Sequence, residues 1–480
     1  MGSLMMGISG VRGIIGESLT PELIVRLGQA YATYLGGGRV VVGRDTRVSG
    51  EMVKHSVFAG LLSSGCSIVD VGVATTPTVA IMIEELGADG GIVVSASHNP
   101  IEWNALKFFC ADGVYLDAAQ GRSLLDIYYQ GDFLRAKWHQ IREVELNSRA
   151  SDVHLKKVLG IVDVEAIRAR RFRVALDSCN GAGVEITSRM LTELGCDLVR
   201  IHCTPDGLFP HDPEPSFENL QDLCKLVRED GKIDAAFAQD PDADRLAVVN
   251  EKGAFIGEEY TLALVADYVL AEAGDEGRGT GERHEASSPS CPSPHAPRPT
   301  VVINMSTSRV IEDIAARHGA RCERVAVGEV NVASRMRSIG AVIGGEGNGG
   351  VIDPRVHYGR DSLVGMALLL ECMAKRGRKL SELAGALPRY HMRKTKADCS
   401  RRGLAAVLSA MRNEGQASGA KIDELDGLRL DWPDAWVHVR PSNTEPIVRV
   451  IGEAADERRV EALVASHVER VRELGAEGAV

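Results

Sequence analysis

Three carboxylates stand at alternate positions in the run QDPDADRLAVVNE, at Asp240, Asp242 and Asp244. Carboxylates this close repel one another unless a cation compensates their charge, and oxygen ligands suit a hard divalent ion, most naturally Mg²⁺. An EF-hand is the rival interpretation because Glu251 is the twelfth residue counted from Asp240. However, the sixth residue is Arg245 where the EF-hand turn requires glycine, and the flanking runs resemble strands. We therefore predict one Mg²⁺ site whose open coordination positions could take a phosphate oxygen. A solvated acidic turn without a metal is the other alternative.

A second run, GGIVVSASHNPIEWNALKF, ends an apolar strand in two serines, a histidine, an asparagine and a proline. Pro100 breaks the strand, and the small residues leave Ser97 accessible. A free serine hydroxyl is a poor nucleophile, and neither a G-x-S-x-G motif nor a triad partner is evident. Beside a Mg²⁺ site, however, Ser97 could carry a phosphoryl group that the metal stabilises. Taken alone, the run would be an ordinary turn.

The run GGEGNGG formally contains G-x-G-x-x-G, but it does not fit a nucleotide site. Pro354 stands where a dinucleotide-binding helix should open, and the Gly-Lys-Ser/Thr ending of a P-loop is missing. A loop whose glycines let Glu346 and Asn348 reach sugar hydroxyls fits better, with a plain hairpin as the alternative.

Cationic and hydroxyl side chains gather in RPSNTEPIVR. Guanidinium groups, hydroxyls and backbone N–H groups in a tight turn form a good phosphate cradle; an ordinary loop with solvated arginines is the alternative. The residues of this candidate cradle are Arg440, Ser442, Asn443, Thr444 and Arg449.

Further positive charge for a reacting phosphate could come from other segments. GISGVRGIIG contributes Arg12, VVGRDTRVSG contributes Arg44 and Arg47, and Lys107 and Arg245 follow the serine and aspartate runs. The alternative for either arginine segment is a surface turn.

The elements that must position these loops recur three times. A β-rich run ends in polar residues in RVVVGRDTR, RVALDSCNG and TVVINMSTSR, and each is followed by a helical stretch and a second, Gly-led strand. The third strands are GGIVVSASHNP, DAAFAQDPDADR and GAVIGGEGNGG. This pattern predicts three similar α/β/α domains with open mixed sheets. Because ligands bind beyond strand ends in such sheets, the three different loops could converge on one cleft.

We expect the first domain at residues 1–150, the second at 151–256 and the third at 257–375. The segment 376–480 contains WVHVRPSNTEPIVRVIGEA and predicts a smaller C-terminal α+β domain. Residues 274–299 are rich in Gly, Ser and Pro, which predicts a disordered surface insertion in the third domain. The two histidines and one cysteine of that insertion are interpreted as part of a solvated loop rather than a metal site.

Composition narrows the function classes. A formal net charge of -11 over 480 residues argues against a nucleic-acid binder. Ten cysteines without CxxC spacing indicate neither a disulfide framework nor a zinc site. The N-terminus lacks a signal-peptide pattern, and Asp267 interrupts the most apolar helical run, so we expect a cytoplasmic protein without a membrane span. No motif for a protein partner is evident.

The ordered set SASHNP, DPDADR, GEGNGG and RPSNTEP resembles the α-D-phosphohexomutases, the family of phosphoglucomutases, phosphomannomutases and phosphoglucosamine mutases. These four signature segments span nearly the whole chain. The resemblance implies four domains around a central cleft and phosphorylation of Ser97. It also implies one Mg²⁺ per chain, held by the three aspartates and a phosphoserine oxygen.

The resemblance further implies a reaction and a role for each residue. Phospho-Ser97 gives its phosphoryl group to a sugar monophosphate, and the resulting sugar bisphosphate, which also serves as activator, turns round before it returns the other phosphate. The net reaction moves phosphate between C6 and C1. The charge-stabilising residues would be Arg12, Lys107 and Arg245. Proton transfer falls to Lys107 or His98, a choice the sequence leaves open. The RPSNTEP residues and Arg449 would hold the fixed phosphate, while Glu346 and Asn348 bind the sugar hydroxyls.

Two departures from the family pattern bear on the substrate. DPDADR stands where the family often has DGDGDR, and GEGNGG stands where many members have Glu-x-Ser, so Asn348 replaces a hydroxyl. The Asn-Gly-Gly loop followed by HYGRD resembles members named phosphoglucosamine mutase, which makes a hexosamine phosphate the expected substrate. Glucose or mannose phosphate is the alternative. A serine-nucleophile phosphatase and a non-catalytic sugar-phosphate binder are the other classes.

Overall fold

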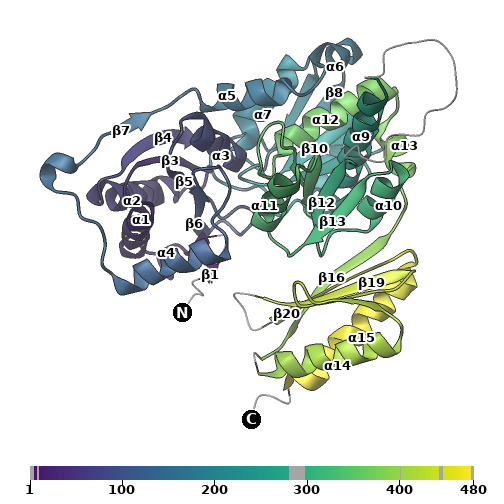
Figure 1. Ribbon diagram of the computed structural model, residues 1–480. Helices are drawn as coiled ribbons and strands as arrows, with labels where there is room; N and C mark the ends of the chain where they lie inside the picture. The colour runs from purple at the N-terminus through teal and green to yellow at the C-terminus, as the bar shows by residue number, and fades with distance from the viewer. Residues whose placement is uncertain (1–4, 8–9, 280–297, 401, 443–446, 477–480) are drawn as a thin grey trace.

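The computed structural model describes residues 5–7, 10–279, 298–400, 402–442 and 447–476 of the chain. Asn443 and Thr444 of the predicted phosphate cradle lie outside the described residues, as do residues 280–297 of the predicted insertion. Four sheets with their helices make up the molecule, and the C-terminal sheet stands apart below the other three in Figure 1.

The first unit contains a seven-stranded sheet in the order β1-β2-β6-β5-β3-β4-β7. Its elements are β1 (Met5–Gly7), β2 (Gly10–Ile14), α1 (Pro21–Leu35), β3 (Arg39–Arg44), α2 (Gly50–Ser63), β4 (Ser67–Val73), α3 (Thr76–Glu85), β5 (Gly90–Val94), β6 (Trp103–Cys110), α4 (Ala118–Gln130), the 3₁₀ helix η1 (Trp138–Gln140) and β7 (Val144–Leu146).

The second and third units each contain a four-stranded sheet. The second is built from α5 (Ala150–Leu159), α6 (Val164–Arg170), β8 (Arg173–Asp177), α7 (Gly183–Glu193), β9 (Asp197–Ile201), α8 (Gln221–Asp230), β10 (Ala235–Gln239) and β11 (Leu246–Asn250). The third comprises α9 (Glu258–Gly279), β12 (Thr300–Asn304), α10 (Val310–Arg317), β13 (Arg321–Val325), α11 (Glu329–Ile339), β14 (Ile343–Glu346), β15 (Gly350–Ile352), α12 (Ser362–Arg376) and α13 (Leu380–Gly385).

The three units share one strand arrangement. In the orders β4-β3-β5-β6, β9-β8-β10-β11 and β13-β12-β14-β15, the first strand of each repeat is central and parallel to the second and third. The fourth strand returns antiparallel to the third. The predicted threefold repeat of mixed α/β/α sheets is therefore confirmed. The loop between the third and fourth strands occupies the same place in each copy. It carries Ser97 in the first unit (the serine loop) and Asp240, Asp242 and Asp244 in the second (the aspartate loop). In the third unit it follows Glu346, the last residue of β14, and carries Asn348 (the glycine loop).

Local signals explain where key elements begin and end. The central strands β5 and β10 are buried along their whole length, as expected for strands covered by helices on both faces. Thr20 caps α1 by accepting the N–H of Leu23, Pro21 occupies the first turn, and Gly36 ends the helix with φ 74°. Asp361 caps α12 in the same way, which places the preceding residue, Arg360, just before the start of this helix.

The C-terminal unit is a five-stranded antiparallel sheet covered on one face by two helices. Its elements are β16 (His391–Asp398), α14 (Gly403–Ala417), β17 (Lys421–Asp423), β18 (Leu428–Asp431), β19 (Ala435–Pro441), β20 (Ile447–Ala454) and α15 (Glu457–Ala476). The apolar sides of β19 and β20 pack on α14 and α15. The predicted α+β character of this unit is confirmed. Leu380, Leu383 and Leu387 pack with α9 and α12, so the C-terminal sheet begins only at His391, downstream of residue 376.

The structure corrects one prediction about the insertion. Residues 274–279, expected to be disordered, belong to the last turns of α9. Extending an existing helix adds a hydrogen bond for each residue fixed and avoids the cost of nucleation, so a Gly-containing stretch can continue a helix that composition alone would end. No helix among the described residues combines the length and apolar character that a bilayer-spanning segment needs.

Candidate active site

The three aspartates lie in the turn between β10 and β11, and all are fully buried. Their nearest carboxylate oxygens lie within 4.8 Å of one another. Ala243 adopts the left-handed φ of 57°, which closes the turn and directs the alternate side chains to one side. The turn also meets the first unit, because the backbone N–H of Thr76, at the start of α3, donates to the carbonyl oxygen of Asp242 at 3.0 Å.

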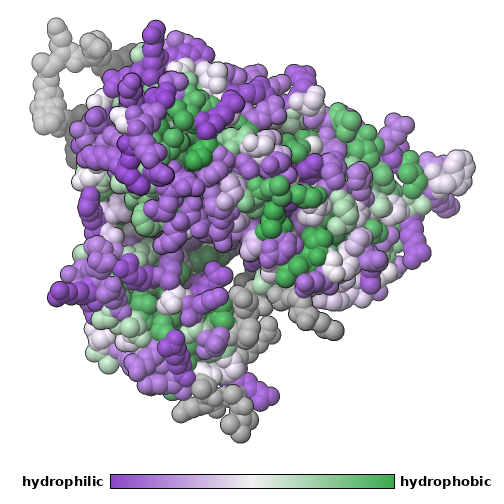
Figure 2. Space-filling model, turned by 180° about the vertical axis from the view of Figure 1, so that it is seen from behind, coloured by the Kyte–Doolittle hydropathy of each residue, from purple (hydrophilic) through white to green (hydrophobic). Residues whose placement is uncertain are grey.

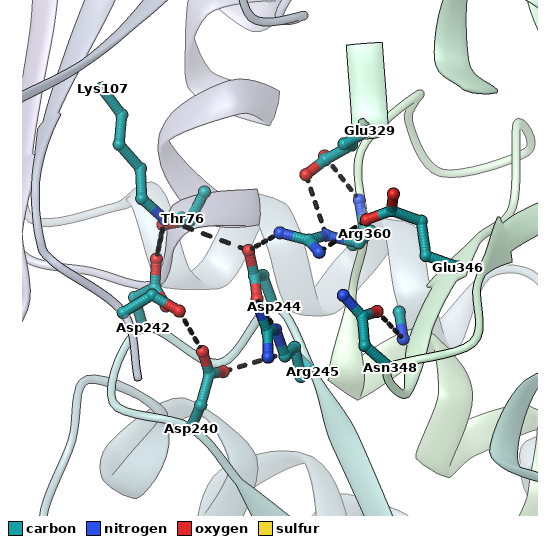
Figure 3. A network of polar contacts seen from close by, with 12 residues as sticks. Thr76, Lys107, Asp240, Asp242, Asp244, Arg245, Glu329, Glu346, Asn348 and Arg360 are labelled. Carbon is teal, nitrogen blue, oxygen red and sulfur yellow. Dashed lines mark hydrogen bonds and ion pairs between the residues drawn. The ribbon is translucent and has the colours of Figure 1, made fainter. Parts of the chain in front are cut away.

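Positive groups surround this acidic cluster without saturating it (Figure 3). Lys107 Nζ on β6 lies 2.6 Å from Asp242 Oδ2 and 4.0 Å from Asp244 Oδ2. Arg360 reaches Asp244 Oδ2 at 2.6 Å. The remaining oxygens, Asp242 Oδ1 and Asp244 Oδ1, are buried and have no hydrogen-bond partner among the described residues. Buried carboxylate oxygens need a partner, and this all-oxygen set suits Mg²⁺.

The electrostatics also favour a cation. Burial, reinforced by the charges of Asp244 and Asp242, raises the pKa of Asp240 well above its usual value. Burial opposes the charge of Asp242 as well, but Lys107 outweighs it and lowers the pKa of that carboxyl. Burial likewise works against Lys107, yet Asp242 holds its pKa above the usual value, so Lys107 is a cation. Lys107, Arg360 and, at 3.9 Å, Arg245 offset part of the negative charge. They leave Asp242 Oδ1 and Asp244 Oδ1 without a hydrogen bond within the described part of the chain, and an added divalent ion would provide that partner.

Ser97 lies in the loop between β5 and β6 and contacts this cluster directly. Its Oγ donates to Asp240 Oδ2 at 2.5 Å and lies 3.2 Å from Nδ1 of His98. The residue has a left-handed φ of 49°, and its N–H donates to Ser95 Oγ at 3.0 Å. The serine and aspartate loops, from two different units, thus meet at one point.

Arg47 holds the serine loop from beneath, a role the sequence did not suggest. Its buried guanidinium donates to the carbonyl oxygens of Ser97, Asn99, Pro100 and Trp103 at 2.6 to 3.1 Å. Its Nε donates to a side-chain oxygen of the neighbouring aspartate, Asp45, at 3.1 Å. These bonds use all the donors of a guanidinium. Arg47 therefore fixes the loop backbone, and our expectation that it would face a reacting phosphate is wrong.

His98 and its neighbours form the outer side of the serine loop. His98 Nε2 lies 3.3 Å from Glu214, and Arg245 donates to the other oxygen of Glu214 at 2.9 Å. Burial, together with the positive charges of Arg245, Arg12 and Lys107, lowers the pKa of His98 well below its usual value. His98 is therefore a neutral imidazole beside the serine hydroxyl, while Lys107 is fully charged. Glu214 was not predicted.

Arg12, on β2, approaches the same loop from another side. Its guanidinium donates to Asn99 Oδ1 at 3.3 Å. The structure thus brings Ser97, His98, Lys107, Arg245 and the three aspartates together, with Arg12 at their edge.

The glycine loop joins this centre through Arg360. Glu346, at the end of β14, accepts Asn304 Nδ2 at 2.8 Å, the N–H of Gly328 at 3.2 Å and Arg360 at 2.8 Å. Burial opposes its charge, but Arg360 outweighs it and lowers the pKa of Glu346. The side chain of Asn348 turns back to accept the N–H of Gly350 at 3.3 Å.

Arg360 is the residue that sequence reasoning missed most clearly. It bridges Asp244 of the second unit to Glu329 and Glu346 of the third, at 2.6, 2.9 and 2.8 Å (Figure 3). Burial raises the pKa of Glu329 even though Arg360 opposes the shift. The only signal in the sequence was the run HYGRD, which indicated a family resemblance but no role for this arginine.

The predicted phosphate cradle lies on the C-terminal sheet. Arg440 on β19 and Arg449 on β20 are directly opposite each other, and Arg449 also faces Lys396 on β16. The N–H of Ser442 donates to the carbonyl of Ile447 at 2.9 Å, which closes the described base of the loop. Like charges directly opposite on neighbouring strands destabilise a sheet. Asp426 Oδ2 lies 3.3 Å from Arg440 Nε. One carboxylate does not balance three cations in register, so the row is expected to hold a further anion, and Lys396 is an addition to the predicted set.

The sheet face that carries this row turns toward the third unit. His438 Nδ1 lies 2.9 Å from Ser306 Oγ, and the N–H of Arg309 donates to Glu453 at 3.0 Å. Lys394 reaches Glu258 and Glu259, at the start of α9, at 2.5 and 3.0 Å. Seen from behind, the surface is hollowed beside the junction of the C-terminal unit with the units above it (Figure 2).

Four family models match successive parts of the chain. Their descriptions read phosphoglucomutase/phosphomannomutase, alpha/beta/alpha domain I for residues 3–135, domain II for 152–253, domain III for 258–390, and C-terminal domain for 392–470.

Relatives of full length point the same way. A protein of Thermococcus kodakarensis named phosphoglucomutase/phosphomannomutase is 40% identical over 470 residues, 96% of each chain. A "Probable phosphoglucosamine mutase" of Methanopyrus kandleri is 37% identical over 467 residues, 97% of each chain. The crystal structure of a phosphoglucomutase/phosphomannomutase family protein from Burkholderia thailandensis matches with a TM-score of 0.83 at 26% identity, covering 99% of this chain and 98% of that one.

Proposed function

The chain belongs to the phosphoglucomutase/phosphomannomutase family, and from this premise we propose that it moves phosphate between C6 and C1 of a hexose or hexosamine monophosphate. The observation that carries the proposal is the 2.5 Å contact between Ser97 Oγ and Asp240 Oδ2. It places the hydroxyl of Ser97, a residue with a left-handed φ, against a carboxylate cluster suited to a divalent cation. A serine in that position is suited to carry and transfer a phosphoryl group.

Each transfer exchanges one P–O bond for another. A sugar hydroxyl oxygen forms a bond to the phosphorus carried by Ser97, and the bond between that phosphorus and Ser97 Oγ breaks. The proton of the sugar hydroxyl passes to neutral His98 and then to Ser97 Oγ, which lies 3.2 Å from His98 Nδ1. The sugar bisphosphate turns round, and the same steps in reverse return its other phosphate to Ser97. Lys107, held protonated by Asp242, is the poorer candidate for proton transfer.

The other residues stabilise the charge of the transferred group or bind the sugar. Mg²⁺ held by Asp240, Asp242, Asp244 and a phosphoserine oxygen would supply positive charge to the transferred group. Lys107, Arg245 and Arg12 surround the same point and add to that charge. Glu346 and Asn348 bind the sugar hydroxyls.

Arg449→Met is expected to weaken binding of the fixed phosphate. A hydrogen bond to a charged group contributes about 1.5–3 kcal/mol, so kcat/KM should fall roughly 10- to 150-fold, mostly through KM. Steady-state kinetics with saturating bisphosphate activator measures both constants. Lys421→Met, on the exposed edge strand of the same sheet, is the matched control and should be near wild type. Unchanged kinetics in Arg449→Met would show that the row of cations on the C-terminal sheet does not bind the fixed phosphate.

The charge around the glycine loop supports a hexosamine as substrate. Glu329 and Glu346 share the guanidinium of Arg360, which also pairs with Asp244, so two buried carboxylates of the third unit have one cation between them beside the proposed sugar site. A protonated amine at C2 would offset their remaining negative charge. The relative named phosphoglucosamine mutase supports the same choice, while the relative named phosphoglucomutase/phosphomannomutase keeps glucose and mannose phosphates as the second candidates.

The substrate is decided by the ratio of kcat/KM for glucosamine 6-phosphate to that for glucose 1-phosphate, with Mg²⁺ and a trace of bisphosphate. We expect the amino sugar to be preferred at least tenfold. Glu329→Gln, which removes one of the buried negative charges, should bring the kcat/KM values for the two sugars closer together. A preference for glucose or mannose phosphate would keep the mechanism and reject the hexosamine assignment.

A further inference from the structure

A second cluster of metal-binding side chains lies in the second unit, at the carboxyl ends of β8 and β9. One oxygen of Asp177, Oδ2, lies 2.8 Å from Nδ1 of His202 and 3.3 Å from Nε2 of His211. The three atoms lie within 4.8 Å of one another. The Asp177 side chain is 2% exposed and the two imidazoles 19% and 14%, so the cluster is sheltered but open to small ions.

The hydrogen bonds of His211 leave one position to be filled. Its Nδ1 lies 2.7 Å from the carbonyl oxygen of Asp212, which is only an acceptor, so Nδ1 carries a proton. Its Nε2 faces Asp177 Oδ2, which is also an acceptor. A neutral imidazole would therefore point a lone pair at a carboxylate. Either a second proton or a metal ion must lie between them.

The surrounding contacts are those that orient metal ligands. The carbonyl partner on His211 Nδ1 fixes both its ring and its tautomer, as the outer partners of metal-bound histidines do. The second oxygen of Asp177, Oδ1, accepts the N–H of Cys179 at 2.9 Å, which leaves Oδ2 directed at the two rings.

We propose that Asp177, His202 and His211 bind one late first-row divalent cation, with Zn²⁺ the best suited, through Oδ2, Nδ1 and Nε2. Two imidazole nitrogens and one carboxylate favour zinc over the magnesium that suits an all-oxygen set. The protons that the two ring nitrogens hold toward Asp177 are released when the ion binds. Water fills the remaining position.

Such an ion would fix a loop that reaches the candidate active site. The segment between β9 and α8 begins at His202 and carries Phe209, whose ring lies 4.8 Å from the guanidinium carbon of Arg47. Further along the same segment, Glu214 contacts His98 and Arg245. Loading the cluster would hold the base of this loop, and through it the two residues that contact the serine-loop machinery.

The test measures zinc bound to the purified full-length protein in excess Mg²⁺, which occupies the all-oxygen cluster. Zinc content after equilibrium dialysis gives the stoichiometry, and Co²⁺ substitution gives a visible absorption band that reports nitrogen ligands. His202→Asn is the first variant, because asparagine tolerates the left-handed φ of 51° at this position. His211→Gln is the second, and exposed His139→Gln is the control.

We expect one zinc per chain in the wild type and in His139→Gln, and at least tenfold weaker binding in both cluster variants. Zinc should also raise the Tm of the wild type but not of the variants. No zinc bound by the wild type, or equal zinc affinity in folded cluster variants, would overturn the proposal. It would mean that a proton, not a metal ion, lies between His211 Nε2 and Asp177 Oδ2. Metal content does not depend on turnover, so the result stands whether or not the protein is a mutase.

Discussion

Ser97→Ala is expected to lower kcat by roughly 10⁴-fold or more while leaving the protein folded. The hydroxyl is the only group of this loop that contacts the acidic cluster, through the 2.5 Å bond to Asp240. If the phosphoryl group travels on Ser97 Oγ, the alanine variant has no oxygen at this position to carry it. Activity is measured with the preferred sugar phosphate in the presence of bisphosphate activator.

The fold of this variant should be preserved because alanine and serine are similar in size, and the loop backbone is held by Arg47 through carbonyl groups that the substitution leaves in place. Ser123→Ala, on the exposed side of α4, is the matched control and should behave as wild type. Retention of more than a few per cent of wild-type kcat would mean that Ser97 does not carry the phosphoryl group.

Asp240→Asn is expected to have opposite effects on activity and on stability. Loss of one metal-binding carboxylate should weaken Mg²⁺ binding and remove several kcal/mol of transition-state stabilisation, roughly 10³-fold in kcat. In the presence of a chelator, however, the variant should be at least as stable as the wild type. It removes one of three buried charges that repel one another. The amide oxygen can still accept the N–H of Arg245, and the amide NH₂ group can donate to Ser97 Oγ in place of the bond that Asp240 accepts.

Thermal unfolding with and without EDTA, together with Mg²⁺ titration of activity, measures both effects. Asp222→Asn on the exposed face of α8 controls for the loss of a surface carboxylate. If Asp240→Asn in EDTA has a lower Tm than the wild type, the three carboxylates do not destabilise the metal-free protein. That result would contradict the inference of a cation site from their repulsion. Unchanged Mg²⁺ dependence would contradict the assignment of Asp240 as a ligand.

The repeated strands and the loops that end them could be predicted because both depend on short-range patterns. A β-rich run followed by polar residues marks the carboxyl end of a strand wherever it occurs. Three such runs in similar surroundings imply three similar sheets. Asp240, Asp242 and Asp244 lie within five residues of one another, so their mutual repulsion is evident from spacing alone.

The groups that connect the loops could not be predicted, because their partners are distant in the sequence. Arg360 gains its meaning from Asp244 and Glu329, which only the packing of the second unit against the third brings within reach. Glu214 contacts His98 across two units in the same way.

Burial changed the meaning of other residues. Arginine is usually found at the protein surface. Arg47, however, is 1% exposed, and all the donors of its guanidinium form hydrogen bonds inside the protein. Asp177, His202 and His211 come from three separate positions, so no cysteine or histidine spacing indicated a zinc cluster. Composition also placed residues 274–279 in a disordered segment because it takes no account of the helix that precedes them.

If phosphate passes between Ser97 and a sugar, an isotope carried by that phosphate should be found on both in turn. The protein is incubated with glucose 1,6-bisphosphate labelled with ³²P, the label is located by peptide mapping, and unlabelled sugar monophosphate is then added. We predict label on the peptide that contains Ser97, up to one phosphoryl group per chain, followed by its complete transfer to sugar. Absence of label from Ser97, or its release as inorganic phosphate rather than sugar phosphate, would contradict the account.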